Sequence, residues 1–295
     1  MRPYEGLLTA MVTPFQADGR VNEESAVALA HHLLANGSNG LVIAGTTGEA
    51  ATLTDDEQVR LVALMVAEAG SEGSIVAGAG SNDTRHAIEL TEAVVEAGAV
   101  AVLSVTPYYN KPNRRGIVRH FEEVARAAAG TPVVLYNIPS RTAVNMAPDL
   151  LAELAQIDGI EAVKQANSAE LQPIDGLAVL AGNDDIFARC LDLGEAGGIC
   201  VASHVVGPEM RRMIDEPERR SEIDASLRDV YETLFLTASP TCTKAALNLL
   251  GHDVGTLRLP MVEADEAETA AVRAMLARHG LTPAGSAAAG PVHAS

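Results

Sequence analysis

The chain has 295 residues, 47% of them hydrophobic, which suits one large α/β barrel with a short extension. A net charge of −18 excludes nucleic acid as a partner, because the phosphate backbone would be repelled. The chain has neither an apolar run of the roughly 18 residues that span a membrane nor a signal-peptide core at Met1–Glu5, so we expect a cytoplasmic protein.

Short apolar runs rich in β-branched residues alternate along the chain with Ala/Leu-rich stretches of helical spacing. This alternation indicates βαβ units and a parallel sheet. Eight strands favour a closed (β/α)8 TIM barrel over an open doubly wound sheet. They are expected at Gly6–Thr13, Gly40–Gly45, Ser74–Gly80, Ala101–Thr106, Pro132–Ile138, Ile160–Lys164, Leu177–Gly182 and Gly198–Ala202.

Helices are expected between these strands. Thr54 and Glu57 have the spacing of a capping box, and Asn82-Asp83 is typical of another helix start. The predicted helices include Glu23–Asn36, Asp55–Glu68, Asp83–Ala97, Arg115–Ala129 and Asp184–Glu195.

After the eighth unit the pattern predicts helices only. They cover Ser221–His279, with breaks near Ser239-Pro240 and Gly251–Pro260. We therefore expect a catalytic barrel over residues 1–218, a C-terminal helical extension over 219–282, and a disordered Ala/Gly/Pro/Ser-rich tail over 283–295.

The strongest single candidate for chemistry is Lys164, at the end of the sixth predicted strand. Reactive groups in α/β barrels lie at the carboxyl ends of strands, and a desolvated lysine is a nucleophile toward carbonyls. The alternative is a lysine that forms a salt bridge or extends to the surface. The only other lysines, Lys111 in a loop and Lys244 in the extension, are weaker candidates.

Polar residues follow other strands as well. The loop Gly45–Glu49 carries Thr46 and Thr47 and suits a carboxylate or phosphate, although a plain polar turn is the alternative. The guanidinium of Arg141 can form two parallel hydrogen bonds to a carboxylate; the alternative is a surface arginine without a functional role. Three of the five tyrosines, Tyr108, Tyr109 and Tyr136, lie at the ends of two neighbouring strands. Their phenols could relay protons, and the alternative is that the rings only pack.

Metal and cofactor signals are weak. Asp184 and Asp185 could bind a metal, but we expect them to cap the following helix. Dinucleotide, Walker A, nucleophile-elbow and zinc-protease motifs are missing from the sequence, so a dinucleotide-binding fold is unsupported. The three cysteines are predicted to be buried, reduced thiols at Cys190, Cys200 and Cys242.

Taken together, these strand ends resemble the dihydrodipicolinate synthase/N-acetylneuraminate lyase family, from about Tyr4 to Pro260. Members of this family are barrels with C-terminal helices that bind pyruvate as a lysine imine. The resemblance rests on Gly45–Glu49, Tyr108–Pro112, Tyr136–Thr142, Lys164 and Gly182–Asp185.

The resemblance implies a role for each matching residue. Lys164 would form the imine, and Tyr136 would be the general acid/base beside it. Thr46 and Thr47 would hold the pyruvate carboxylate, with Thr47 also in a proton relay. Tyr109 would complete the relay in a neighbouring subunit, and Arg141 would bind the acceptor's carboxylate. Gly182 and Ile199 would supply backbone carbonyls around the site.

Within the family, Arg141 favours the synthase branch, in which pyruvate condenses with aspartate semialdehyde for lysine and diaminopimelate synthesis. The resemblance implies that this reaction proceeds on the imine of Lys164 and needs no metal and no organic cofactor. The resemblance also implies a homo-oligomer, as a dimer of dimers. Gln165 departs from the family, where an acidic residue commonly follows the lysine. The alternatives are an aldolase for 2-keto-3-deoxy sugar acids and a non-catalytic keto-acid sensor, although a decayed sensor would be expected to lose Lys164 or a relay tyrosine.

The resemblance bears on feedback inhibition too. Asn82 and Tyr108 match positions that hold the amino-acid end of an inhibitory lysine in sensitive members. At the side-chain end, Asp55 and Gln58 replace histidines and His86 replaces a glutamate. We therefore expect weak inhibition by lysine, or none.

Overall fold

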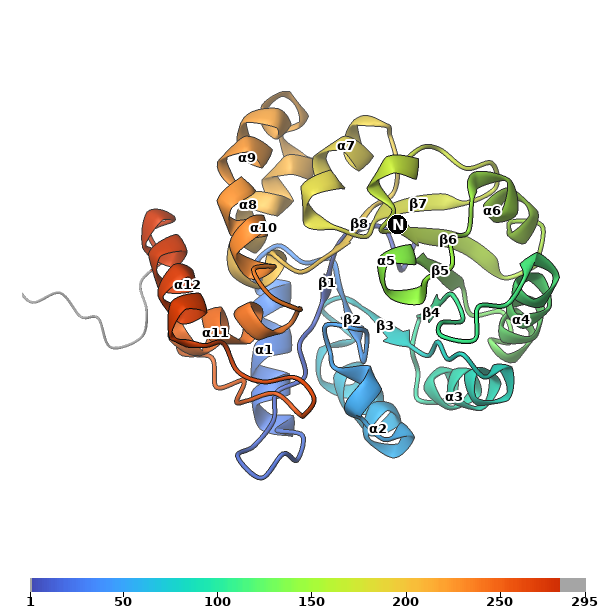
Figure 1. Cartoon of the computed structure of the whole chain (residues 1–295), viewed down its shortest axis with the longest axis horizontal. Coiled ribbons are helices and arrows are strands. Elements are labelled where there is room, and N and C mark those ends of the chain that lie inside the picture. Colours follow the sequence, from blue (N-terminus) through green and yellow to red (C-terminus); the bar gives the residue numbers. More distant parts are fainter. Residues whose placement is uncertain (1, 282–295) are drawn as a thin grey trace, which may run out of the picture.

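The computed structural model describes residues 2–281 and contains a closed barrel of eight parallel strands in the order β1 to β8 (Figure 1). All eight strands expected from the sequence are confirmed, most of them one to three residues shorter. They are β1 Gly6–Ala10, β2 Gly40–Ile43, β3 Ser74–Gly78, β4 Ala101–Val105, β5 Val133–Asn137, β6 Ile160–Gln165, β7 Ala178–Ala181 and β8 Gly197–Cys200.

Helices surround the barrel, and four more follow it on one side of the molecule (Figure 1). Those around the barrel are α1 Glu23–Ala35, α2 Asp55–Ala69, α3 Thr84–Glu96, α4 Arg114–Ala127, α5 Pro139–Thr142, α6 Pro148–Leu154, α7 Phe187–Asp192 and α8 Ser203–Asp215. Those that follow are α9 Arg220–Ser226, α10 Arg228–Leu234, α11 Thr241–Leu249 and α12 Glu266–Arg278. The division at residue 218 stays a prediction, and the expected tail lies outside the described residues.

Three apolar clusters fill the fold. One lies inside the barrel and includes Val134, Ala162 and Leu180, and the other two pack between the strands and the surrounding helices. Side chains alternate along a strand, so residues with the parity of Val134 and Ala162 point inward. Tyr136 and Lys164 have that parity, and the fold therefore directs both toward the barrel interior.

Local start signals are realised where they were expected. Thr54 caps α2: its side chain accepts the N–H of Glu57, and the carboxylate of Glu57 accepts the N–H of Thr54. Asp83 caps α3 by accepting the N–H of Arg85. The three cysteines are buried and unpaired, as predicted. Among the described helices, none is both long and apolar enough to cross a bilayer.

Candidate active site

Lys164 and Tyr136 lie side by side because β5 and β6 pair in parallel with these two residues as direct partners. The Nζ of Lys164 lies 4.4 Å from the centroid of the Tyr136 ring. Both side chains are buried, with exposed fractions of 5% and 6%. A primary amine and a phenol thus share one water-poor volume at the carboxyl ends of the strands.

Lys164 differs from the other buried lysine in what its ammonium contacts. Within residues 2–281, no hydrogen-bond acceptor or carboxylate contacts the Nζ of Lys164. Lys244 is more deeply buried, but its Nζ donates to the carbonyl of Thr256 and forms an ion pair with Glu49. Burial alone therefore does not single out Lys164. The free amine of Lys164 is the one able to attack a carbonyl.

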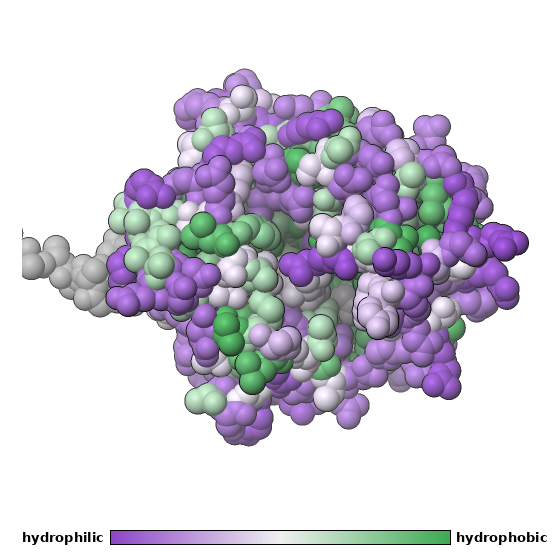
Figure 2. Space-filling view, viewed as in Figure 1, coloured by the Kyte–Doolittle hydropathy of each residue, from purple (hydrophilic) through white to green (hydrophobic). Residues whose placement is uncertain are grey.

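A cavity of about 400 Å³ is lined by Tyr136, the strand partner of Lys164. Thr46, Tyr136 and Arg141 line it, which brings together residues from the carboxyl ends of β2 and β5. Figure 2 shows a mostly hydrophilic face with a hollow near its centre. The cavity continues between α2 and α3, where its wall includes Asp55, Gln58, His86 and Tyr108.

The loop after β2 forms a compact turn at the cavity. The N–H of Glu49 donates to the carbonyl of Thr46 at 3.1 Å, and the hydroxyl of Thr13 donates to the carbonyl of Gly48 at 2.6 Å. Thr46 is exposed toward the cavity, whereas Thr47 is buried. Within the described part of the chain, no hydrogen bond joins the hydroxyls of Thr47, Tyr136 and Tyr109. The proton relay among them therefore stays a prediction.

Arg141 lies in the short helix α5, and its guanidinium contacts no acceptor among the described residues. The segment around it is held by Asn137, a fully buried residue whose role the sequence did not reveal. Its Nδ2 donates to the carbonyl of Met146 and to Oε1 of Gln165, and its Oδ1 accepts the N–H of Met146. The side-chain amide of Asn137, which both donates and accepts, thus makes the contacts that hold this segment. None of them uses the guanidinium of Arg141.

Gln165, which stands where an acidic residue is common in the family, is held by hydrogen bonds to its side-chain oxygen. Its Oε1 accepts hydrogen bonds from Asn137 and from the N–H of Asn167, both at 3.0 Å. An amide oxygen thus meets two donors that a carboxylate could also meet. The Nε2 of Gln165 is buried and has no hydrogen-bond partner among the described residues.

The expectation that Asp184 and Asp185 cap a helix was wrong. Asn183 is the capping residue of the short 3-10 turn there, and no side-chain cap hydrogen bond forms. Asp184 instead accepts the N–H groups of Val201 and Ala202, at 2.9 and 3.0 Å, just after β8. Burial raises the pKa of Asp184, while those two donors and the charge of Lys164 oppose the rise. Residues 2–281 contain no group of three His, Cys, Asp or Glu side chains suited to a metal.

Gly182 and Ile199 end neighbouring strands near this carboxylate. A side chain at Gly182 would approach the backbone N of Ala166 to 2.8 Å, so only glycine fits there. Ile199 is buried inside the barrel, with an exposed fraction of 1%. Their carbonyl roles stay predictions.

Tyr109 does not enter this site in the single chain. Its side chain is 88% exposed, and its φ of +66° is in the left-handed region. Neighbouring Tyr108 is 39% exposed and also lines the cavity. Aromatic side chains are enriched at interfaces between proteins, which makes this exposed ring a candidate contact with another molecule.

Two of the residues expected to decide lysine inhibition, Asp55 and His86, contact one another. Nε2 of His86 lies 2.9 and 3.0 Å from the two carboxylate oxygens of Asp55, and Nδ1 lies 3.1 Å from the hydroxyl of Ser81. The carboxylate of Asp55 is therefore already engaged.

Comparisons with known proteins agree with this fold. The model of the Dihydrodipicolinate synthetase family matches residues 3–279. The chain is 43% identical to the 4-hydroxy-tetrahydrodipicolinate synthase of Heliobacterium modesticaldum, over 93% of this chain and 95% of that protein. The synthase of Symbiobacterium thermophilum is 42% identical, with 95% and 100% covered. The crystal structure of DHDPS from Cyanidioschyzon merolae with lysine bound superposes with a TM-score of 0.91 at 39% identity, covering 95% of this chain and 100% of that one.

Proposed function

This chain belongs to the dihydrodipicolinate synthetase family, and we propose that Lys164 forms the pyruvate imine on which the family's reaction proceeds. The chain is an enzyme that condenses pyruvate with aspartate semialdehyde to 4-hydroxy-tetrahydrodipicolinate, in lysine and diaminopimelate biosynthesis. One observation carries the assignment of Lys164: its buried Nζ has no acceptor among the described residues and lies 4.4 Å from the ring of Tyr136.

The imine supplies the electron sink of the reaction. Nζ of Lys164 attacks C2 of pyruvate and water leaves, which forms the C=N bond. The imine acidifies the pyruvate methyl group, and Tyr136 moves protons at this centre. The resulting enamine forms a C–C bond to the aldehyde carbon, and the amine of the adduct then attacks C2 and displaces Lys164. Because the imine accepts the electron pair, these steps require neither a metal nor an organic cofactor.

Two regions of the cavity orient the substrates. Thr46 and Thr47 hold the pyruvate carboxylate at the turn after β2, and Thr47 also relays protons. Arg141 binds the carboxylate of the semialdehyde, a role supported by its position on the cavity wall and its free guanidinium. Gly182 and Ile199 contribute backbone carbonyls around the imine.

We also propose a homo-oligomer, as a dimer of dimers, in which Tyr109 completes the relay in a neighbouring subunit. The exposed ring of Tyr109 supports this proposal, since within one chain it reaches none of the groups that it would serve. Cytoplasmic localisation stays a prediction.

Reductive trapping tests the imine. Borohydride with pyruvate should add one adduct per chain, and peptide mapping should place it on Lys164. Lys164→Ala should abolish the adduct, whereas Lys111→Ala, a change in an exposed loop, should leave it. An adduct on Lys111 or Lys244 in the wild type would overturn the assignment. Turnover with aspartate semialdehyde, compared with a 2-keto-3-deoxy sugar acid, tests the acceptor.

Mixing two inactive variants tests the shared site. Tyr109→Phe and Lys164→Ala chains should each be inactive alone. If Tyr109 serves a neighbour, hybrid oligomers contain sites with both residues intact, and activity should reappear on mixing. Exchange of chains is followed by mass spectrometry of tagged subunits. Demonstrated exchange without any recovery would count against a role across the interface.

A further inference from the structure

A fully buried ion pair joins the C-terminal helices to the turn after β2. Nζ of Lys244, in α11, lies 2.6 Å from Oε1 of Glu49, and their side chains are only 1% and 2% exposed. Burial lowers the pKa of Lys244, and the charge of Glu49 opposes that fall. Such a pair is costly to desolvate, so it is weak evidence for stability and calls for another explanation.

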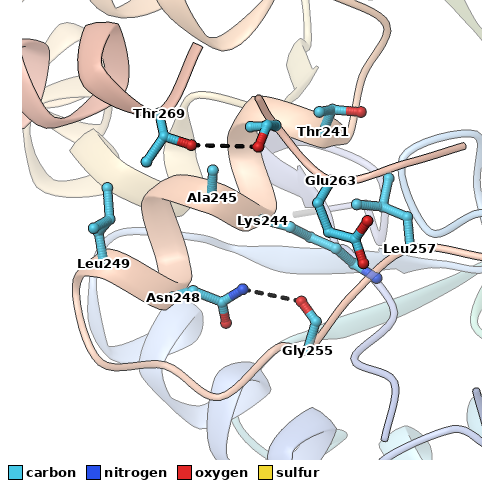
Figure 3. Close-up of a pocket in the computed structure, with 10 residues that line it drawn as sticks. Thr241, Lys244, Ala245, Asn248, Leu249, Gly255, Leu257, Glu263 and Thr269 are labelled. Carbon is cyan, nitrogen blue, oxygen red and sulfur yellow. Dashed lines mark hydrogen bonds between the residues drawn. The ribbon is translucent and has the colours of Figure 1, made fainter. Parts of the chain in front are cut away.

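The remaining polar atoms of the pair also contact the C-terminal segment. Oε2 of Glu49 accepts the N–H of Arg258 at 3.0 Å, and Nζ of Lys244 donates to the carbonyl of Thr256 at 2.7 Å. Figure 3 shows the Lys244 side chain extending from α11 past Glu263, with its nitrogen at the far end. The connection between α11 and α12 therefore clamps Glu49 from one side.

Glu49 in turn determines the shape of the turn that carries Thr46 and Thr47. Its backbone adopts a φ of +56°, a left-handed conformation that is unfavourable for a residue with a side chain. In this conformation its N–H closes the turn on the carbonyl of Thr46. A strained residue persists only where its surroundings hold it, and the carboxylate of Glu49 is held by Lys244 and by the N–H of Arg258.

We infer that Glu49 and Lys244 are positioning residues for pyruvate, acting through the turn of Thr46 and Thr47. The C-terminal helices are then part of the substrate-binding machinery, although neither residue touches substrate. This inference rests on the proposed function, in which that turn holds the pyruvate carboxylate. It implies that loss of the ion pair weakens pyruvate binding without affecting the acceptor side, where Arg141 lies in a different loop.

A double variant separates positioning from stability. Glu49→Gln or Lys244→Met alone leaves a buried charge without its partner and should destabilise the fold. Glu49→Gln combined with Lys244→Met removes both charges, and the Gln oxygen can still accept the N–H of Arg258. We expect this double variant to fold and its half-saturating pyruvate concentration, measured by borohydride trapping, to rise at least tenfold. The KM for semialdehyde should stay within about twofold of wild type.

Leu276→Ala is the matched control, because Leu276 is a fully buried residue of α12 away from the turn. It should lower the melting temperature and leave the pyruvate dependence unchanged. A double variant with wild-type pyruvate dependence overturns the inference, as does an equal rise in Leu276→Ala. If the double variant does not fold, Glu49→Asp withdraws the carboxylate while keeping its charge. It should raise the half-saturating pyruvate concentration, and a wild-type value would again overturn the inference. Failure of the wild type to form any adduct would instead overturn the proposed function itself.

Discussion

Replacing Arg141 by alanine should impair use of the semialdehyde while leaving imine formation intact. Arg141 lines the cavity with Thr46 and Tyr136, and its guanidinium contacts no acceptor among the described residues. A substrate carboxylate would therefore be its partner. Charge-assisted hydrogen bonds contribute about 1.5–3 kcal/mol, so their loss corresponds to about a ten- to hundredfold fall in kcat/KM for semialdehyde.

The surrounding structure should survive this change. The loop is held by Asn137 through Met146 and by the hydroxyl of Thr142, which lies 3.0 Å from the carbonyl oxygen of Ile138 and 2.8 Å from that of Val144. None of these contacts uses the side chain of Arg141. Arg141→Lys keeps the charge but loses the planar fork, so its loss should be intermediate.

Two measurements together decide the matter. A coupled turnover assay at saturating pyruvate gives kcat/KM for semialdehyde, and borohydride trapping gives the pyruvate dependence of the imine. Arg115→Ala, which removes another exposed arginine, on α4, serves as the control and should leave both unchanged. Equal losses in both assays for Arg141→Ala would show that the residue serves pyruvate or the fold, and our reasoning would then be refuted.

Two further predictions concern regulation and pH. Because His86 already engages the carboxylate of Asp55, half-inhibition by L-lysine should require millimolar concentrations or more, measured as turnover at saturating pyruvate. His86→Glu should release Asp55, add a second carboxylate and increase sensitivity to L-lysine about ten- to hundredfold. Sub-millimolar inhibition of the wild type would contradict this view. Hydrogen bonds from Arg258 lower the pKa of Glu57 to about 2 from an ordinary 4.5. Because the pKa of Glu57 is lower in the folded than in the unfolded protein, its ion pair with Arg258 stabilises the fold. This stabilisation is complete above about pH 4.5 and is lost as the pH falls toward 2. The difference in unfolding free energy between wild type and Glu57→Gln should therefore shrink over that range, and a constant difference in urea titrations would disprove the assignment.

Local signals in the sequence predicted much of the fold. Short apolar runs that alternate with stretches of helical spacing predicted all eight strands, because a strand of a parallel sheet is buried on both faces and is therefore apolar along its length. The capping box at Thr54 and Glu57 was equally readable, because both of its hydrogen bonds close within one helical turn. The small number of lysines and the position of Lys164 at a strand end sufficed to select it as the candidate nucleophile.

Only the tertiary structure decided how distant polar groups pair. Asp184 was expected to cap its own helix, yet the barrel brings β8 close enough for two backbone N–H groups there to bind its carboxylate. Lys244 lies far along the chain from Glu49, and no local pattern predicts that an unremarkable helix lysine is the partner of a loop glutamate. Secondary structure follows from neighbours in sequence, whereas the pairing of buried charges depends on which elements closure of the barrel brings together.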